Sequence, residues 1–531
     1  MPPESDQIKE GLSPALAKSF LLYSELHKFE GEEENDSAIT SAVWYEKLRA
    51  AVEYQETHLM FKNAVARIIR RSLLISVKIK KEKIYNDLVN ELIWANYITP
   101  KTIDESKSKK VNYILDKYLT IIRRANSINK SNSEIIRYFS GICACEIEEE
   151  IFDKRAENQY LDFVFLAIKD NYKNNIKHIN DQDHIVQLKL AIYTNIFKPD
   201  VSYLSYWSLK LTHTNWLVID IDDCKNLTKS IDPFMASFER HLSHPLRSRY
   251  LILVRNMVSP FSVIRTHLLL NNVSKKWAED NPILLENNLC QSYESLRMQS
   301  NAKIWRGIWR ALIFLLMTKT VLAFIIEIPV DRAIHGNILW LPLIANITFP
   351  PFLMFLSGIT IPKIPQKNSK LMKEAFFEII NTGRLTNEKA LVIEKKKRTK
   401  TFNFFNYLLA IFSLLVLILV VFFLLRLKFN VVSIVLFFLF VSAVSFLSFR
   451  IRVNSKELLI KRKSQDSITT LVEFIFLPFI SLGKAMSDSL NRLNPFLLAV
   501  DFIIEAPFKT ILKILRAWFN FISLKKEEME Y

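Results

Sequence analysis

Two long uncharged runs dominate the hydrophobic pattern of this chain. Residues 401–425 contain no charged side chain, and a second uncharged run covers residues 429–449. About 20 apolar residues in an α-helix span the hydrocarbon core of a bilayer, and the helix satisfies its own backbone polar groups there. We therefore predict a transmembrane hairpin over residues 401–450.

An earlier pair of apolar stretches predicts another hairpin, over residues 304–362. Its first span covers residues 311–330 and follows a basic, aromatic entry. Its second span lies within residues 333–362, where Pro342 and the pair Pro350-Pro351 indicate a kinked or partly unwound helix. The pattern thus predicts four membrane spans arranged as two hairpins.

The N-terminal half has the pattern of a helical domain. Residues 1–40 form a polar leader with an acidic run, and residues 41–303 repeat apolar positions at the spacing of amphipathic helices, for example in residues 64–77. The one strand-like stretch, residues 216–221, is short and isolated. The expected fold is therefore all-α, with a multi-helix domain ahead of the two hairpins.

The C-terminal segment, residues 451–531, predicts a basic flank followed by membrane-surface elements. The apolar stretches 468–483 and 496–508 carry acids and prolines, which favours re-entrant or interfacial elements over full spans. Residues 508–524 place cations on one helical face and apolar residues on the other, the pattern of an interfacial amphipathic helix. The alternative is an ordinary helix packed on the N-terminal domain. The candidate headgroup contacts are Lys509, Lys513 and Arg516.

The distribution of charge predicts which segments face the cytoplasm. The net charge is +17, yet residues 1–300 carry 40 basic and 39 acidic side chains, so the excess lies in residues 301–531. The connection formed by residues 363–400 alone holds 11 basic and 4 acidic side chains. Cytoplasmic loops are enriched in Lys and Arg. We therefore expect both termini, the helical domain and this connection on the cytoplasmic side of a plasma (inner) membrane.

The same excess of cations predicts anionic lipid headgroups as partners on the cytoplasmic face. The candidate contacts in the 363–400 connection are Lys395, Lys396, Lys397 and Arg398. Nucleic acid is not an expected partner, because the N-terminal half has no basic surplus to neutralise phosphates.

Lys319 and Glu327 are two ionisable residues within the first predicted span. On a regular helix, eight residues correspond to about 80° of rotation and about 12 Å of rise, so we expect the two not to pair with each other. One interpretation is a polar site for ion or solute movement. The other is that each charge fixes packing through a partner on another helix, or that Lys319 snorkels to the interface.

No pattern in the chain predicts catalysis. Asp220, Asp222 and Asp223 follow an apolar run, an arrangement that can bind Mg²⁺, but no phosphate-holding loop accompanies them. A capped helix end is the favoured interpretation. Glycine is scarce, with 8 residues in the chain, which argues against nucleotide-binding glycine motifs.

The cysteines do not predict a metal site. Cys143 and Cys145 are one residue apart, and His241 and His244 lie far downstream. Zinc sites use wider cysteine spacing and a matched second pair, so buried thiols are the favoured interpretation. We therefore expect no enzyme activity, no cofactor and no metal.

The leading hypothesis is a multi-pass membrane protein that acts as a membrane-anchored scaffold or interaction protein. Its helical domain would meet protein partners that the sequence does not identify, and its basic segments would meet lipid. The alternative is a small transporter or channel that uses Lys319, Glu327 and the proline-broken second span.

Overall fold

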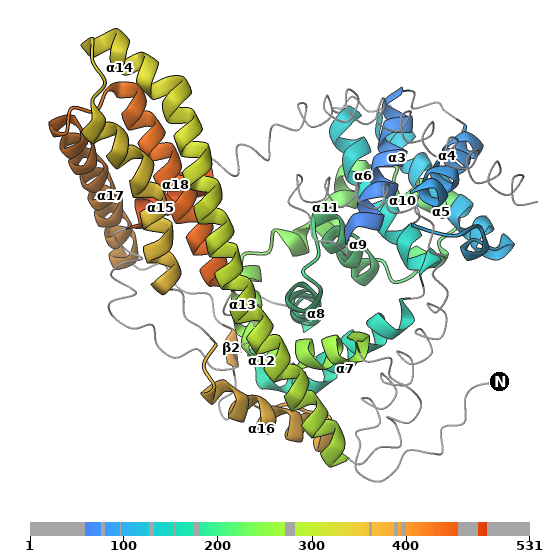
Figure 1. Ribbon diagram of the computed structural model, residues 1–531. Helices are drawn as coiled ribbons and strands as arrows, with labels where there is room; N and C mark the ends of the chain where they lie inside the picture. Colours follow the sequence, from blue (N-terminus) through green and yellow to red (C-terminus); the bar gives the residue numbers. More distant parts are fainter. Residues whose placement is uncertain are drawn as a thin grey trace, which may run out of the picture. The chain divides into compact units, whose positions relative to one another are not determined.

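The fold was taken from a computed structural model, which describes residues 59–75, 80–95, 97–126, 132–152, 154–174, 181–270, 282–360, 364–386, 391–393, 400–454 and 476–485. These residues are almost entirely α-helical (Figure 1). They fall into two compact units. The N-terminal unit holds the described residues up to 282 together with those of 378–394, and the apolar unit holds 283–377 and the described residues after 395.

The helices of the N-terminal unit are α3 (Met60–Ile75), α4 (Lys81–Trp94), α5 (Glu105–Asn126), α6 (Asn132–Ile151), α7 (Arg155–Ile168), α8 (Asp181–Phe197), α9 (Val201–Thr212), α10 (Ile221–Leu227), α11 (Ile231–Leu242) and α12 (Arg247–Leu270). Helix α6 is central and packs against α3, α5 and α9. Gly141 allows the close approach to α9, because a Cβ there would lie 2.4 Å from Ser202 Oγ.

The strand-like stretch at residues 216–221 does not form a strand. Trp216–Val218 form a short 3-10 helix and α10 begins at Ile221. Trp216 is buried while Val218 is exposed, so this apolar run does not line a sheet.

Two short strands, which the sequence did not predict, join distant parts of the chain. Strand β1 (Tyr172–Asn174) pairs in parallel with β2 (Leu391–Ile393). Nearby, the backbone N–H of Leu385 donates to the carbonyl of Ala167 at 3.1 Å. The Leu385 carbonyl accepts a hydrogen bond from Asn171 Nδ2 at 2.6 Å. The 363–400 connection therefore returns to the N-terminal unit.

The apolar unit contains α13 (Pro282–Leu322), a π-helical turn η6 (Ala323–Glu327), α14 (Ile328–His335), α15 (Trp340–Thr360), the first part of α16 (Lys367–Thr382), α17 (Lys400–Arg426), α18 (Val431–Asn454) and a helix over Phe476–Ala485. Figure 1 shows α15 and α18 beside the half of α13 that leads into α14, with α17 on their far side. The expected domain boundary at residue 303 falls inside α13.

Among the described residues, two helices are long and apolar enough to cross a membrane. They are Pro282–Ile334, which runs through α13, η6 and α14, and Val431–Phe449 within α18. The apolar helices Trp340–Leu356, Ala410–Arg426 and Phe476–Ala485 are shorter. Length and composition thus support two spans, where the sequence pattern predicted four.

Helix α15 runs without interruption from Trp340 to Thr360, although Pro350 and Pro351 lie inside it. The expected unwinding at this proline pair is therefore not seen. Proline removes one backbone donor and crowds the preceding turn, but a helix packed against neighbours tolerates this. Gly358 supports the packing: a Cβ at this position would lie 2.9 Å from the side chain of Ile308 on α13.

Candidate functional site

The apolar unit buries several polar side chains inside a hydrophobic core and exposes large apolar side chains on its surface. Its buried polar side chains are Lys319, Glu327, Asp331, Asn346, Asn368, Asn430, Ser433, Ser442, Ser445 and Ser448. Large apolar side chains also lie on its surface: Phe314, Phe324 and Ile418 are each at least 60% exposed. Soluble proteins bury such side chains and expose charged ones. The distribution in this unit suits an apolar surrounding.

Lys319 and Glu327 form a direct ion pair, so the prediction that they would not pair was wrong. Lys319 Nζ lies 3.0 Å from Glu327 Oε1, and the two side chains are 0% and 1% exposed. The Lys319 ammonium also lies above the ring of Phe440 on α18, 4.7 Å from its centroid. One charge of each sign is therefore enclosed between α13 and α18.

The π-helical turn η6 explains the pairing. A π turn closes its hydrogen bonds over five residues and so accommodates one extra residue. One residue is worth about 100° of helical rotation, which cancels the roughly 80° offset of an eight-residue spacing. Lys319 and Glu327 then share one face, and their long side chains close the remaining axial distance.

A second polar group continues from Glu327 along the same face. Asp331 lies four residues after Glu327, and its Oδ1 accepts a hydrogen bond from Asn430 Nδ2 at 2.6 Å. Asn430 Oδ1 in turn accepts from the backbone N–H of Ser433 at 2.7 Å, at the start of α18. Asn346 Nδ2 on α15 donates to the Ser433 carbonyl at 3.3 Å. The cluster links α14, α15 and α18.

Three buried oxygen atoms in this region lack hydrogen-bond partners in the described structure. They are Glu327 Oε2, Asn346 Oδ1 and Ser445 Oγ. Each retains the capacity to accept a hydrogen bond, at a cost to the fold of roughly 1–3 kcal/mol. The ion pair itself leaves neither charge open to an ion or solute, because each neutralises the other.

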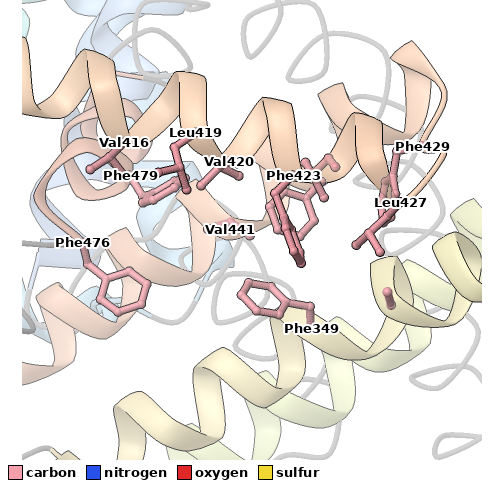
Figure 2. Close-up of a pocket in the computed structure, with 13 residues that line it drawn as sticks. Phe349, Val416, Leu419, Val420, Phe423, Leu427, Phe429, Val441, Phe476 and Phe479 are labelled. Carbon is pink, nitrogen blue, oxygen red and sulfur yellow. The ribbon is translucent and has the colours of Figure 1, made fainter.

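A separate cavity lies between α15, α17, α18 and the helix Phe476–Ala485. Its volume is about 330 Å³ (Figure 2). Its walls are wholly apolar and are formed by Ala345, Phe349, Val416, Leu419, Val420, Phe423, Leu424, Leu427, Phe429, Phe437, Val441, Phe476 and Phe479. Figure 2 shows Phe349 facing the labelled side chains of the opposite walls. A cavity of this kind accepts apolar groups and offers nothing to a hydrated ion.

Polar contacts fasten the start of α16 to the first half of α13. Asn368 Nδ2 donates to the hydroxyl of Tyr293 at 2.7 Å. Ser369 Oγ donates to Glu294, and the backbone N–H of Ile364 donates to Asn301 Oδ1 at 3.2 Å. The segment that follows α15 therefore lies beside the part of α13 that precedes its apolar stretch.

In the N-terminal unit, the acidic C-terminal half of α6 pairs with cations from neighbouring helices. Buried Lys117 pairs with Glu146 and also donates to the Trp216 carbonyl at 3.1 Å. Desolvation would raise the pKa of Glu149, but the ion pair and hydrogen bonds with Lys210, aided by Tyr206, lower it overall. These contacts satisfy buried charges and hold helices together.

Cys143 and Cys145 are both buried in α6, and desolvation raises the pKa of each thiol well above its usual value. Across the described ranges, no group of three or more His, Cys, Asp and Glu is placed to hold a metal ion. His241 lies 3.9 Å from Asp183, and His244 accepts a hydrogen bond from the backbone of Leu246. The structure therefore does not bring the cysteines and histidines to one site.

The remaining sequence-predicted residues divide into two groups. Asp220 occupies the N-cap position of α10 without a side-chain cap, and Asp222 pairs with Lys225 on the surface. The basic cluster 395–398 and the cations Lys509, Lys513 and Arg516 lie outside the described residues.

Comparisons with protein-family models, curated proteins and solved structures found no match to this chain.

Proposed function

We propose that this protein is a multi-pass membrane protein whose apolar unit anchors a helical interaction domain, without catalysis of its own. The observation that carries the proposal is the combination of a buried ion pair with many exposed large apolar side chains in the apolar unit. In lipid, the outward side chains need no cover, whereas an intramembrane charge is stable only when it is paired.

The β1–β2 pair supports a return crossing between α13 and residue 385. A segment hydrogen-bonded to the N-terminal unit lies on that unit's side of a bilayer, so the chain between them crosses an even number of times. If α13 crosses, a second crossing follows it, and α15 is the apolar helix in that interval. We therefore propose that α15 spans with some tilt or local thinning of the bilayer.

We propose the second hairpin, formed by α17 and α18, from the distribution of basic residues. The 11 basic residues of the 363–400 connection favour the cytoplasmic side. Helix α17 is 27 residues long and enters the fold from that connection. If α17 crosses outward and α18 crosses back, every strongly basic segment among the described residues faces the cytoplasm.

The interaction surface of the N-terminal unit is proposed to include the exposed apolar tip before α10. Val218 is 82% exposed and Leu217 is 45% exposed, and Asp222 and Asp223 lie close by in sequence. Large exposed apolar side chains beside acids favour a protein partner with a basic rim. Anionic lipid remains the partner proposed for the basic connection.

Cell fractionation of the full chain and of two variants tests whether the apolar unit anchors the protein in a membrane. The full chain should resist extraction by alkaline carbonate, and the Lys319→Leu/Glu327→Leu variant should behave identically. A variant Val218→Glu should stay in the membrane but lose proximity-labelled protein neighbours. Release of the full chain by carbonate would contradict the proposal.

A transporter is the second candidate, favoured by the unsatisfied buried oxygens of Glu327, Asn346 and Ser445. Its test is flux in proteoliposomes that contain the full chain. Saturable flux of an ion or solute that disappears in the Lys319→Leu/Glu327→Leu variant would support transport and overturn the anchor as the main function.

A further inference from the structure

The apolar cavity beside α17 is open to the outside of the apolar unit along one wall. Leu419 is 60% exposed and Phe423 is 59% exposed, although both line the cavity. Phe349 on α15 is also partly exposed, whereas Val441 and Phe479 are buried. A ligand in this space would therefore lie against buried side chains on one side and reach the unit's surface on the other.

One end of the cavity meets the turn between α17 and α18, and that turn carries two exposed cations. Leu427 and Phe429 line the cavity, while Arg426 and Lys428 alternate with them and are exposed. The Arg426 guanidinium lies over the ring of Phe422, 5.2 Å from its centroid. The cavity is thus apolar, and the turn at one end of it carries two exposed cations.

The backbone at Lys428 is held in a strained conformation. Its φ is 62°, in the left-handed region where glycine is the usual residue at a helix C-terminus. The backbone N–H groups of Lys428 and Phe429 donate to Leu425 and Leu424, which closes the helix. A lysine in the position where glycine is easiest costs about 1 kcal/mol. The turn therefore carries a cation at the position where glycine is easiest.

We propose that this cavity binds one acyl chain of an anionic phospholipid, with the headgroup on Arg426 and Lys428. Hydrocarbon fits walls with no polar side chain, and lateral access past Leu419 and Phe423 lets a chain enter from the bilayer. Two cations on the turn beside the cavity complement a phosphate. The inference rests on the proposed membrane location of the apolar unit.

Native mass spectrometry of the purified full chain tests the site. The protein, extracted in mild detergent, is exchanged into detergent containing phosphatidylglycerol or phosphatidylcholine of the same acyl composition. The wild type should retain one phosphatidylglycerol per chain and far less phosphatidylcholine. Ala345→Phe fills the cavity and should lower retention at least tenfold.

Val435→Phe is the matched control, because Val435 lies on α18, is 60% exposed and does not line the cavity. It should retain lipid as the wild type does. Val420→Phe fills the cavity from α17 and replaces Ala345→Phe if that variant does not fold. Lys428→Gly should lower the preference for phosphatidylglycerol severalfold while the Tm stays equal or rises.

Two results would overturn the proposal: equal retention in both cavity-filling variants and the wild type, or equal retention of the two lipids by the wild type. Carbonate extraction of the same variants checks the membrane location independently. A carbonate-resistant protein that holds no lipid in the cavity disproves this inference alone.

Discussion

The Lys319–Glu327 pair stabilises the apolar unit only while both charges are present. Each side chain is nearly inaccessible, and Phe440 covers the ammonium. Removal of one partner leaves a single buried charge, which costs about 3–5 kcal/mol, whereas replacement of both by apolar residues of similar size is often neutral. If the pair serves packing, the double substitution should leave the protein stable and functional. If the pair serves transport, the double substitution should abolish flux.

We expect Lys319→Leu and Glu327→Leu each to lower stability by roughly 3 kcal/mol and the double variant to recover most of that loss. Thermal unfolding of the detergent-solubilised full chain measures this cycle. Phe314→Leu is the control, because Phe314 is 66% exposed. Additive losses in the double variant would show that the charges do not stabilise each other.

We expect the imidazole of His267 on α12 to make stability depend on pH. Burial lowers its pKa from 6.5 to about 4. The unfolded chain takes up this proton near pH 6.5 and the folded chain does not, so the free energy of unfolding is highest above pH 6.5 and falls as the pH drops toward 4. The loss is at most about 3 kcal/mol.

His267→Gln should remove this share of the pH dependence. Unfolding of the wild type and the variant is compared at pH 7.5 and pH 4.5, where the wild type should lose more stability than the variant. Because both proteins contain the same carboxylates, the difference between them isolates the imidazole. Parallel pH curves for the two proteins would rule out His267 as the source.

At the level of elements, hydrophobic periodicity predicted helices well because most are long and amphipathic. The features that it did not predict have identifiable physical causes. The π turn η6 leaves no composition signal, so a regular helix placed Lys319 and Glu327 on different faces. Strands β1 and β2 are each 3 residues long and pair across more than 200 positions, which periodicity does not detect.

Close helix contacts in the apolar unit depend on glycine. A Cβ at Gly483 would lie 2.3 Å from the Ser442 carbonyl and 2.6 Å from Phe446 Cβ, so the helix Phe476–Ala485 would have to move away from α18. We expect Gly483→Ala to lower the Tm by overpacking, at a cost of about 1–3 kcal/mol. Differential scanning fluorimetry in detergent measures the shift.

Gly307 provides the matched comparison for this prediction. It lies within α13 with no atom within 4 Å of an added Cβ, so Gly307→Ala should stabilise the helix by about 0.5–1 kcal/mol. The two identical substitutions should therefore shift the Tm in opposite directions. A stabilising Gly483→Ala would mean that the contact with α18 is not tight in solution.

At the level of the whole molecule, the number of crossings decides which loops share a side of the membrane. The uncharged runs in the sequence predicted the apolar helices, but long-range pairing is what joins Leu385 and residues 391–393 to the N-terminal unit. If only α13 and α18 crossed, the 363–400 connection and the 426–430 turn would lie together on the side opposite the N-terminal unit. With four spans, they lie on opposite sides.

Substituted-cysteine labelling separates these two topologies. Lys370 and Lys428 are both exposed, and the native Cys143, Cys145 and Cys224 are buried, with burial raising the pKa of each thiol, so they react slowly. Cys290 is replaced by Ser. With four spans, an impermeant maleimide applied to intact cells should label Lys428→Cys and spare Lys370→Cys until the membrane is opened. Labelling of both positions from outside would establish two spans and place the basic connection across the membrane from the cytoplasm, which β2 pairing and the distribution of Lys and Arg oppose.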